Sequence, residues 1–251
     1  VSRVSLLDVD PGADTNRTVV TFVGPPDAVV DAAFLAIKKA SEILDMRTHK
    51  GAHARMGATD VCPLVPVSEV TMEECVILSK KLADRVGREL SIPIFLYEYS
   101  AANNLRSNLA NIRSGEYEGM TEKLKNQKWK PDFGPEKLHL TAGVTAIGAR
   151  EFLIAYNINL NSHEKKIASD IALDIREAGR GKRNSDGKFI READGTIVNV
   201  PGSLKSTKAV GWYIDEYRQA QVSMNLTATY YTKSTDRTHV TYRTREDSAP
   251  P

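Results

Sequence analysis

Amphipathic helices alternate with short apolar strands along this chain, and that alternation constrains its fold more than any other feature. Apolar residues recur every three or four positions over residues 30–44 and again over 72–90. Thr71 and Glu74 form a capping box at the start of the second stripe. Because a helix with one apolar face must bury it against another element, the pattern predicts an α/β sandwich in which helices cover a sheet.

The same pattern of strand and helix starts again near residue 150, which predicts two subdomains, residues 1–148 and 149–251. Each is expected to hold a mixed β-sheet with helices on one face. Strands are predicted at residues 3–9, 17–23, 60–67, 92–97, 151–160, 210–217 and 219–226, and helices at 105–112, 117–125 and 161–175. After Leu226 the sequence is polar, so the second subdomain is expected to be incomplete.

Charge and composition exclude several classes of protein. The 251 residues carry 34 basic and 32 acidic side chains, a balance that does not predict nucleic-acid binding. The most apolar stretch, residues 147–160, is interrupted by Arg150 and Glu151, so no membrane span is expected. Two cysteines, Cys62 and Cys75, cannot build a disulfide framework, and they favour a reducing compartment such as the cytoplasm.

Residues 46–59 form the stretch richest in chemically active side chains. They contain two histidines, three basic residues and two glycines without apolar periodicity, which predicts a loop. His53 is a candidate acid/base because imidazole titrates near neutral pH, although a solvated loop histidine fits the same pattern. His49 raises the alternative of a metal site, but Gly51 argues against the helix that such a pair needs, and no metal is expected.

Asp8 and Asp10 are two positions apart on a predicted strand, so they project from the same side. A carboxylate there could orient an imidazole. The alternative is a turn-forming aspartate before Pro11 and Gly12.

Two further segments have the composition of ligand-binding loops. The first combines rigid and permissive backbone positions with an imidazole and a hydroxyl, and could wrap a flat ligand: Gly134, Pro135, Glu136, Lys137, Leu138, His139, Leu140, Thr141, Ala142 and Gly143. The second places Arg180, Lys182 and Arg183 just beyond a predicted helix end, where they either cap the helix or anchor a carboxylate-rich ligand. Residues 180–206, with turns at 185–187 and 193–195, are expected to form an exposed flap.

Several ordered motifs together resemble the glutamate formiminotransferase family, over residues 5 to about 226. They are Leu6-Leu7-Asp8-Val9-Asp10, Thr15-Asn16-Arg17-Thr18-Val19, Thr21-Phe22-Val23-Gly24-Pro25-Pro26, His49-Lys50-Gly51-Ala52-His53-Ala54-Arg55-Met56-Gly57-Ala58, Asp60-Val61-Cys62-Pro63, Pro131-Asp132-Phe133-Gly134-Pro135, Gly211-Trp212-Tyr213 and Ala220-Gln221-Val222-Ser223-Met224-Asn225-Leu226.

The resemblance implies transfer of a formimino group between N-formimino-L-glutamate and N5 of tetrahydrofolate, a step of histidine breakdown and one-carbon metabolism. It implies a tetrahydrofolate co-substrate, a folate cleft or tunnel enclosed by the two subdomains, and a homodimer. His53 would be the catalytic histidine with Asp10 beside it, and Gly134 to Gly143 would contact folate. Lys50, Arg55, Arg180, Lys182 and Arg183 are expected to bind the anionic substrates.

Two residues beside His53 depart from the family's pattern: Ala52 and Ala54 stand where the family has Glu and Pro. The family's first strand and turn precede the position of Val1, and residues 227–251 also depart from the pattern. Two alternatives therefore stay open, a non-catalytic or impaired pterin-binding protein and a transferase that moves a formyl group through the same site.

Overall fold

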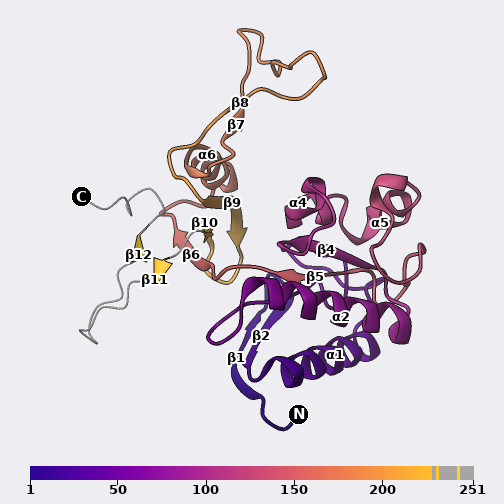
Figure 1. Ribbon diagram of the computed structural model, residues 1–251. Coiled ribbons are helices and arrows are strands. Elements are labelled where there is room, and N and C mark those ends of the chain that lie inside the picture. The colour runs from indigo at the N-terminus through magenta and orange to yellow at the C-terminus, as the bar shows by residue number, and fades with distance from the viewer. Residues whose placement is uncertain (228–229, 232–241, 244–251) are drawn as a thin grey trace, which may run out of the picture. The chain divides into compact units, whose positions relative to one another are not determined.

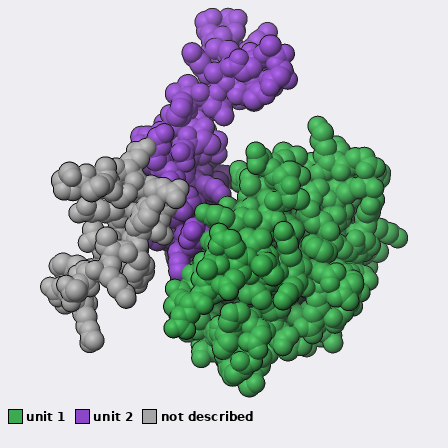
Figure 2. All heavy atoms as spheres, viewed as in Figure 1, with its two compact units in different colours: residues 1–150 green, residues 151–251 purple. Residues whose placement is uncertain are grey.

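The chain divides into two compact units, residues 1–150 and 151–251, which Figure 2 shows in separate colours. The computed structural model describes residues 1–227, 230–231 and 242–243. The division falls two residues beyond the boundary that the sequence predicts. Among the described residues, no helix is both long and apolar enough to cross a membrane.

The first unit is built around a small parallel sheet. Its elements are β1 (Ser5–Gly12), β2 (Arg17–Val23), α1 (Pro26–Ile43), β3 (Val61–Leu64), α2 (Met72–Leu90), β4 (Ile94–Glu98), α3 (Asn104–Ser107), α4 (Leu109–Arg113), α5 (Glu116–Leu124), a 3₁₀ turn η1 (Gln127–Trp129) and β5 (Thr145–Ala149). The strand order is β3-β5-β4, and both pairs are parallel. This confirms the predicted α/β class, and the capping box of Thr71 and Glu74 forms as expected at the start of α2.

The sequence does not predict the central strand, β5. It predicts a loop at residues 134–143 and places the next strand at residues 151–160. The sequence of β5 is Thr-Ala-Ile-Gly-Ala, and all five residues are buried. A strand buried on both faces shows no alternation, and its small residues and Gly148 weaken the apolar signal. Gly148 is needed there because a Cβ would lie 2.3 Å from the carbonyl oxygen of Tyr97.

Helices cover both faces of this sheet, as Figure 1 shows, whereas the sequence predicts helices on one face. Ile94 and Leu96 of β4 pack in a core with α1 and α2. The alternate residues Phe95 and Tyr97 pack in a second core with residues of α4 and α5. Successive side chains of a strand point to opposite faces, so β4 supplies both cores. The short helices α3 to α5, whose pattern is weak in the sequence, provide the second layer.

The two strands predicted at residues 3–9 and 17–23 form the β1–β2 hairpin, which is antiparallel, with Val9 opposite Val20 and Asp10 opposite Val19. Phe22 packs against the core of α1 and α2, which attaches the hairpin to the unit. Its connecting turn, residues 13–16, lies next to the loop that carries His53.

The second unit has an antiparallel sheet of order β6-β10-β9 with one helix on it. Its elements are β6 (Ile154–Asn159), α6 (Lys165–Ile175), β7 (Arg180–Gly181), β8 (Asn199–Val200), β9 (Thr207–Ile214), β10 (Gln219–Leu226), β11 (Tyr230–Tyr231) and β12 (Tyr242–Arg243). Helix α6 approaches β9 closely, because a Cβ on Gly211 would lie 2.1 Å from the backbone nitrogen of Ser169. The hairpin of β9 and β10 confirms the predicted pair of strands.

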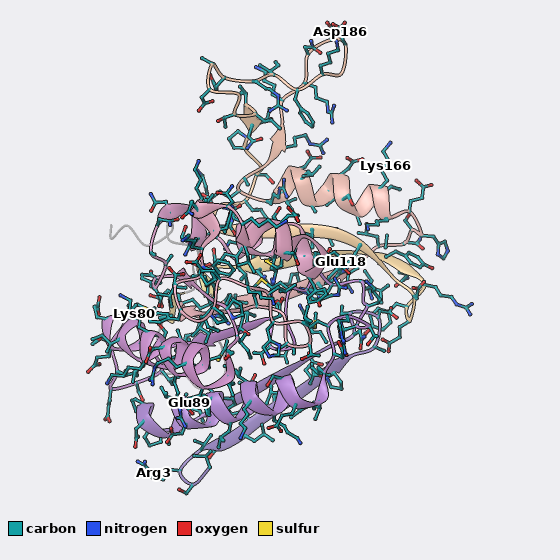
Figure 3. The ribbon with its side chains drawn as sticks, turned by 90° about the vertical axis from the view of Figure 1, so that its right-hand side faces the viewer. Arg3, Lys80, Glu89, Glu118, Lys166 and Asp186 are labelled. Atoms are coloured by element: carbon teal, nitrogen blue, oxygen red, sulfur yellow. The ribbon has the colours of Figure 1, made fainter. Side chains whose placement is uncertain are left out.

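Residues 181–199 form an extended double turn beyond β7, with Asp186 at its tip (Figure 3). This agrees with the predicted flap. The prediction that residues after Leu226 leave the subdomain incomplete concerns a segment that lies mostly outside the described residues.

Candidate functional site

The loop of residues 44–60, which carries His53, runs alongside the segment that ends at Gly143. Met46 N donates to Thr141 O at 2.9 Å, Ala58 N to Ala142 O at 2.9 Å and Val144 N to Met56 O at 3.0 Å. Three backbone hydrogen bonds therefore join the predicted catalytic loop to the end of the predicted folate segment. The structure brings these two sequence motifs together, although about 80 residues separate them in the chain.

The turn of the β1–β2 hairpin docks on the other side of the same loop. Ala52 N donates to Asp14 O at 2.9 Å, Asn16 Nδ2 to Lys50 O at 2.5 Å, and His49 Nε2 to Asn16 O at 2.8 Å. Gly51 allows this approach, since a Cβ there would lie 2.4 Å from the carbonyl oxygen of Thr15. These contacts hold the backbone directly before His53 next to the backbone directly before Arg17.

His53 is half-buried at this junction, and its pKa is lowered to about 4. Burial is the main cause, followed by the positive charges of Arg17 and Arg113, while Asp60 and a backbone hydrogen bond with Ala54 raise the pKa. The imidazole is consequently neutral at pH 7, the form that accepts a proton.

The carboxylate whose charge acts on His53 is that of Asp60. It accepts a hydrogen bond of 2.8 Å from Met56 N, and it forms an ion pair with Arg113, whose Nε lies 2.7 Å from Oδ2. Both side chains are about four-fifths buried. Asp60 thereby attaches the end of α4 to the loop after His53.

Asp10, which the sequence predicts beside the imidazole, lies exposed on β1, and its charge acts on Arg17. Arg17 in turn acts on His53. The role of Asp10 next to the imidazole stays a prediction.

The predicted folate segment, Gly134 to Gly143, is fixed at both ends and exposed between them. Gly134 has a φ of +80°, and a Cβ there would lie 2.4 Å from the carbonyl oxygen of Ile92. At the other end, His139 Nδ1 accepts a hydrogen bond of 3.0 Å from Ala142 N. The exposed residues are Gly134, Pro135, Glu136, Lys137 and Leu140, and those that are partly or fully buried are Leu138, His139, Thr141, Ala142 and Gly143.

Lys50 and Arg55, predicted to bind substrate, both contact the first turn of α5. Lys50 Nζ lies 2.6 Å from Glu118 Oε1. Arg55, only 10% exposed, donates to Glu116, to both oxygens of Glu118 and to the carbonyl oxygen of His49. Those contacts use all five of its N–H groups, so the geometry gives Arg55 a role in holding the loop.

The same turn of α5 also contacts the predicted folate segment, since Tyr117 OH donates to Leu140 O at 2.5 Å. Tyr117 N donates to Arg55 O at 2.9 Å. Glu118, which Figure 3 labels on α5, has its pKa lowered by hydrogen bonds from Arg55 and Lys50. A pocket of about 390 Å³ opens here, lined by Lys50, Gly51, Arg55, Gly115, Glu116 and Glu118.

In the second unit, the three predicted basic residues differ in their partners. Arg180 donates to Asp174 Oδ1 at 2.7 Å and to the carbonyl oxygen of Asp170, so it caps the acidic end of α6. Arg183 stacks on Phe189, with its guanidinium carbon 3.8 Å from the ring centre. Lys182 is exposed at the base of the flap.

Among the residues that the structure describes, no group of three His, Cys, Asp or Glu side chains could hold a metal ion. Three charged residues at the His53 junction were not predicted as site residues: Arg17, Asp60 and Arg113. Arg17 and Asp60 lie inside two of the family motifs, Thr15 to Val19 and Asp60 to Pro63, and that membership is the sequence signal that could have identified them. Arg113 lies in a helix of weak periodicity and carries no such signal.

The fold and the junction together define a two-unit α/β protein that holds a neutral imidazole between two glycine-containing loops, flanked by arginines and a carboxylate. The formiminotransferase domain, N-terminal subdomain, matches residues 1–150, and the formiminotransferase domain matches residues 155–250. The chain therefore belongs to the formiminotransferase family, which confirms the resemblance seen in the sequence. The second match includes residues 227–250, which were expected to depart from the family's pattern.

Curated relatives agree with this assignment. A formimidoyltransferase-cyclodeaminase of Dictyostelium discoideum is 53% identical over 222 residues, which are 88% of this chain and 38% of that protein. Glutamate formimidoyltransferases of Streptococcus pyogenes and Thermoplasma acidophilum are 47% and 43% identical over 90% of this chain and 68% of their own lengths. The chain thus spans 38% of the length of the formimidoyltransferase-cyclodeaminases that it matches.

Proposed function

We propose that this protein transfers a formimino group between N-formimino-L-glutamate and N5 of tetrahydrofolate. The observation that carries the proposal is the neutral, half-buried imidazole of His53, held between the β1–β2 turn and the folate segment. The names of the relatives, glutamate formimidoyltransferase and formimidoyltransferase-cyclodeaminase, support the same reaction.

The chemistry requires one group to accept a proton and later return it. As the N5 amine attacks the amidine carbon, a new C–N bond forms and the amine loses a proton to the neutral ring of His53. The imidazolium then donates that proton to the glutamate nitrogen as the old C–N bond breaks, and the histidine is neutral again. Proton transfer by a positioned side chain typically contributes about 10² to 10⁴ in rate.

Other residues of the proposed site bind and orient the substrates. Gly134 to Gly143 would contact the pterin, and its hydrogen bonds to the His53 loop would keep N5 near the imidazole. In the first unit, Lys50 would bind an anionic group of the substrates. In the second unit, Arg180, Lys182 and Arg183 would bind carboxylates of the folate glutamate tail. Asp10 would stabilise the positive charge that develops on His53, acting beside Arg17.

The test is to incubate the purified protein with formiminoglutamate and tetrahydrofolate and to follow the folate product by absorbance. His53→Gln should lower kcat about 10²- to 10⁴-fold, and His163→Gln, a change at an exposed residue of the second unit, should not. Unchanged turnover in His53→Gln would remove the catalytic role of this residue.

The same assay separates the alternatives. Saturable tetrahydrofolate binding without product would favour a non-catalytic pterin-binding protein, which the replacement of the family's Glu and Pro by Ala52 and Ala54 motivates. Formyl transfer from formylglutamate would release the same glutamate, so formimino and formyl transfer are distinguished by the mass of the folate product formed from each donor. We also propose a cytoplasmic homodimer, which the family resemblance and the free thiols of Cys62 and Cys75 support, and light scattering in solution tests the dimer.

A further inference from the structure

Arg17 is held beside His53 by hydrogen bonds of neighbouring residues, and none of these bonds uses the side chain of Arg17. It directly follows Asn16, whose carbonyl oxygen accepts from His49 and whose amide donates to Lys50 O. His53 directly follows Ala52, whose nitrogen donates to Asp14 O. Two hydrogen-bonded backbone segments thus end at these two residues, and β2 continues from Arg17 as a paired strand opposite β1.

The guanidinium of Arg17 differs from those of its neighbours in having no hydrogen-bond or ion-pair partner among the described residues. Arg55 uses all its donors on Glu116, Glu118 and His49, and Arg113 is paired with Asp60. Arg17 is exposed, so a dissolved anion can reach it. Its five N–H donors form a planar fork that matches a carboxylate.

The charges around the junction leave Arg17 only partly compensated. Three charged residues face the junction: Arg17 of β2, Arg113 of α4 and Asp60, which directly precedes β3. Asp60 already forms an ion pair with Arg113. Asp10 of β1 acts on Arg17 at a distance. On the loop, Lys50 and Arg55 are neutralised by Glu116 and Glu118 of α5, and His49 donates to a carbonyl oxygen.

The electrostatics of Arg17 agree with this geometry. Its pKa is lowered, first by partial burial and then by repulsion from Arg113, while Asp60 and Asp10 raise it. The positive charge of Arg113 disfavours the charge of Arg17, and an anion bound at Arg17 would offset that repulsion.

We propose that Arg17 binds a carboxylate group of the amino-acid substrate beside His53. This inference rests on the proposed function and names the residue that recognises the glutamate part of formiminoglutamate. The position of Arg17 places the bound carboxylate next to the group that must transfer protons.

A bound carboxylate would also change His53. Arg17 is the largest charge-based cause that lowers the pKa of His53, after burial. A carboxylate paired with Arg17 would cancel that repulsion and raise the pKa of His53 from about 4 toward its ordinary value of 6.5. An imidazole with a pKa nearer the working pH is the better acid/base, so substrate binding would improve the catalyst. By linkage, protonation of His53 must strengthen carboxylate binding equally.

The test uses glutarate as a simple dicarboxylate and follows the imidazole of His53 by ¹H–¹³C NMR from pH 6 to 7.5, where carboxylates are ionised. His53→Gln identifies the signal. Saturating glutarate should increase the protonated fraction of His53 in the wild-type protein. In Arg17→Gln without glutarate, the protonated fraction of His53 should be higher than in the wild-type protein without glutarate. Adding glutarate to this variant should not change that fraction. Arg88→Gln, which removes an exposed helical ion pair, is the control and should behave as wild type.

Kinetics provide the second measurement. Arg17→Gln should raise KM for formiminoglutamate about 10- to 100-fold and leave KM for tetrahydrofolate unchanged, and Arg17→Lys should have a smaller effect because it keeps the charge but loses the fork. Equal glutarate affinity in wild type and Arg17→Gln, or a His53 signal that ignores glutarate, would overturn the proposal. The NMR result stands without turnover, so failure of the proposed reaction and failure of the carboxylate site are distinguishable.

Discussion

Gly57 and Gly143 lie opposite each other where the His53 loop meets the proposed folate segment, and neither position has room for a side chain. A Cβ on Gly57 would lie 2.0 Å from Val144 O, and one on Gly143 would lie 2.2 Å from Met56 O. Gly143 also has a φ of +70°, a left-handed conformation that other residues adopt at a cost. The close approach is what allows the hydrogen bonds between the two segments.

Gly143→Ala should therefore lower the free energy of unfolding by about 2–4 kcal/mol, because it adds backbone strain and a steric clash with Met56. It should also lower activity, since the two loops must separate to admit the methyl group. Urea denaturation measures the first effect. Gly119→Ala is the matched control: nothing lies within 4 Å of a Cβ there, and the residue is inside α5, so this change should stabilise by about 0.5–1 kcal/mol. Equal stability of the two variants would contradict the prediction.

Glu118→Gln should loosen the His53 loop. The variant leaves the guanidinium of Arg55, which is 10% exposed, with Glu116 as its remaining carboxylate partner. Hydrogen bonds to charged groups contribute about 1.5–3 kcal/mol, and the exposure of Glu118 reduces this, so a loss of about 1–2 kcal/mol in urea denaturation is expected. Glu122→Gln changes a residue of the same helix that is 75% exposed and pairs with Lys125, and it should alter stability by less than about 0.5 kcal/mol.

The sequence predicts the framework of the fold well, because amphipathic periodicity and capping residues are local signals. The capping box at Thr71, the two strands β1 and β2 and the loop around His53 all form as expected. The strand β5 is missed because burial on both faces removes alternation, and the second helical layer is missed because α3 to α5 are short. These features depend on tertiary contacts that no local pattern records.

The partners of the site residues were equally hard to predict. Lys50 and Arg55 look alike as basic loop residues, yet Arg55 is buried on Glu116 and Glu118, residues about 60 positions away. Arg17 and Asp60 meet at His53 only because the hairpin turn docks on the loop. By contrast, the family resemblance assigns both the His53 loop and the segment ending at Gly143 to one site. Their contact in space is therefore consistent with that resemblance.

Asp132→Asn should destabilise the chain just before the proposed folate segment, residues 134–143. Asp132 Oδ1 accepts from Arg106 at 2.8 Å, and Oδ2 accepts from Leu96 N at 2.8 Å. The side chain of Asp132 is 12% exposed and that of Arg106 is 7% exposed. Removing one partner of a buried ion pair costs about 3–5 kcal/mol, and the amide keeps part of the hydrogen bonding, so a loss of about 2–4 kcal/mol is expected in urea denaturation. Asp84→Asn, which breaks an exposed helical pair with Arg88, should cost less than about 1 kcal/mol.

The lowered pKa of His53 predicts how stability depends on pH. The folded protein holds this pKa at about 4, whereas the unfolded chain has about 6.5, so between these values the unfolded state binds more protons. Stability should consequently fall as the pH drops from 6.5 toward 4, and at higher pH His53 should have no effect. The full shift corresponds to about 3 kcal/mol, and partial solvent exposure reduces the expected loss to about 1–2 kcal/mol. Reversible urea denaturation at several pH values measures it. His53→Gln should lose this part of the pH dependence and His163→Gln should retain it, whereas parallel stability curves for His53→Gln and the wild type would show that His53 keeps an ordinary pKa in the folded protein.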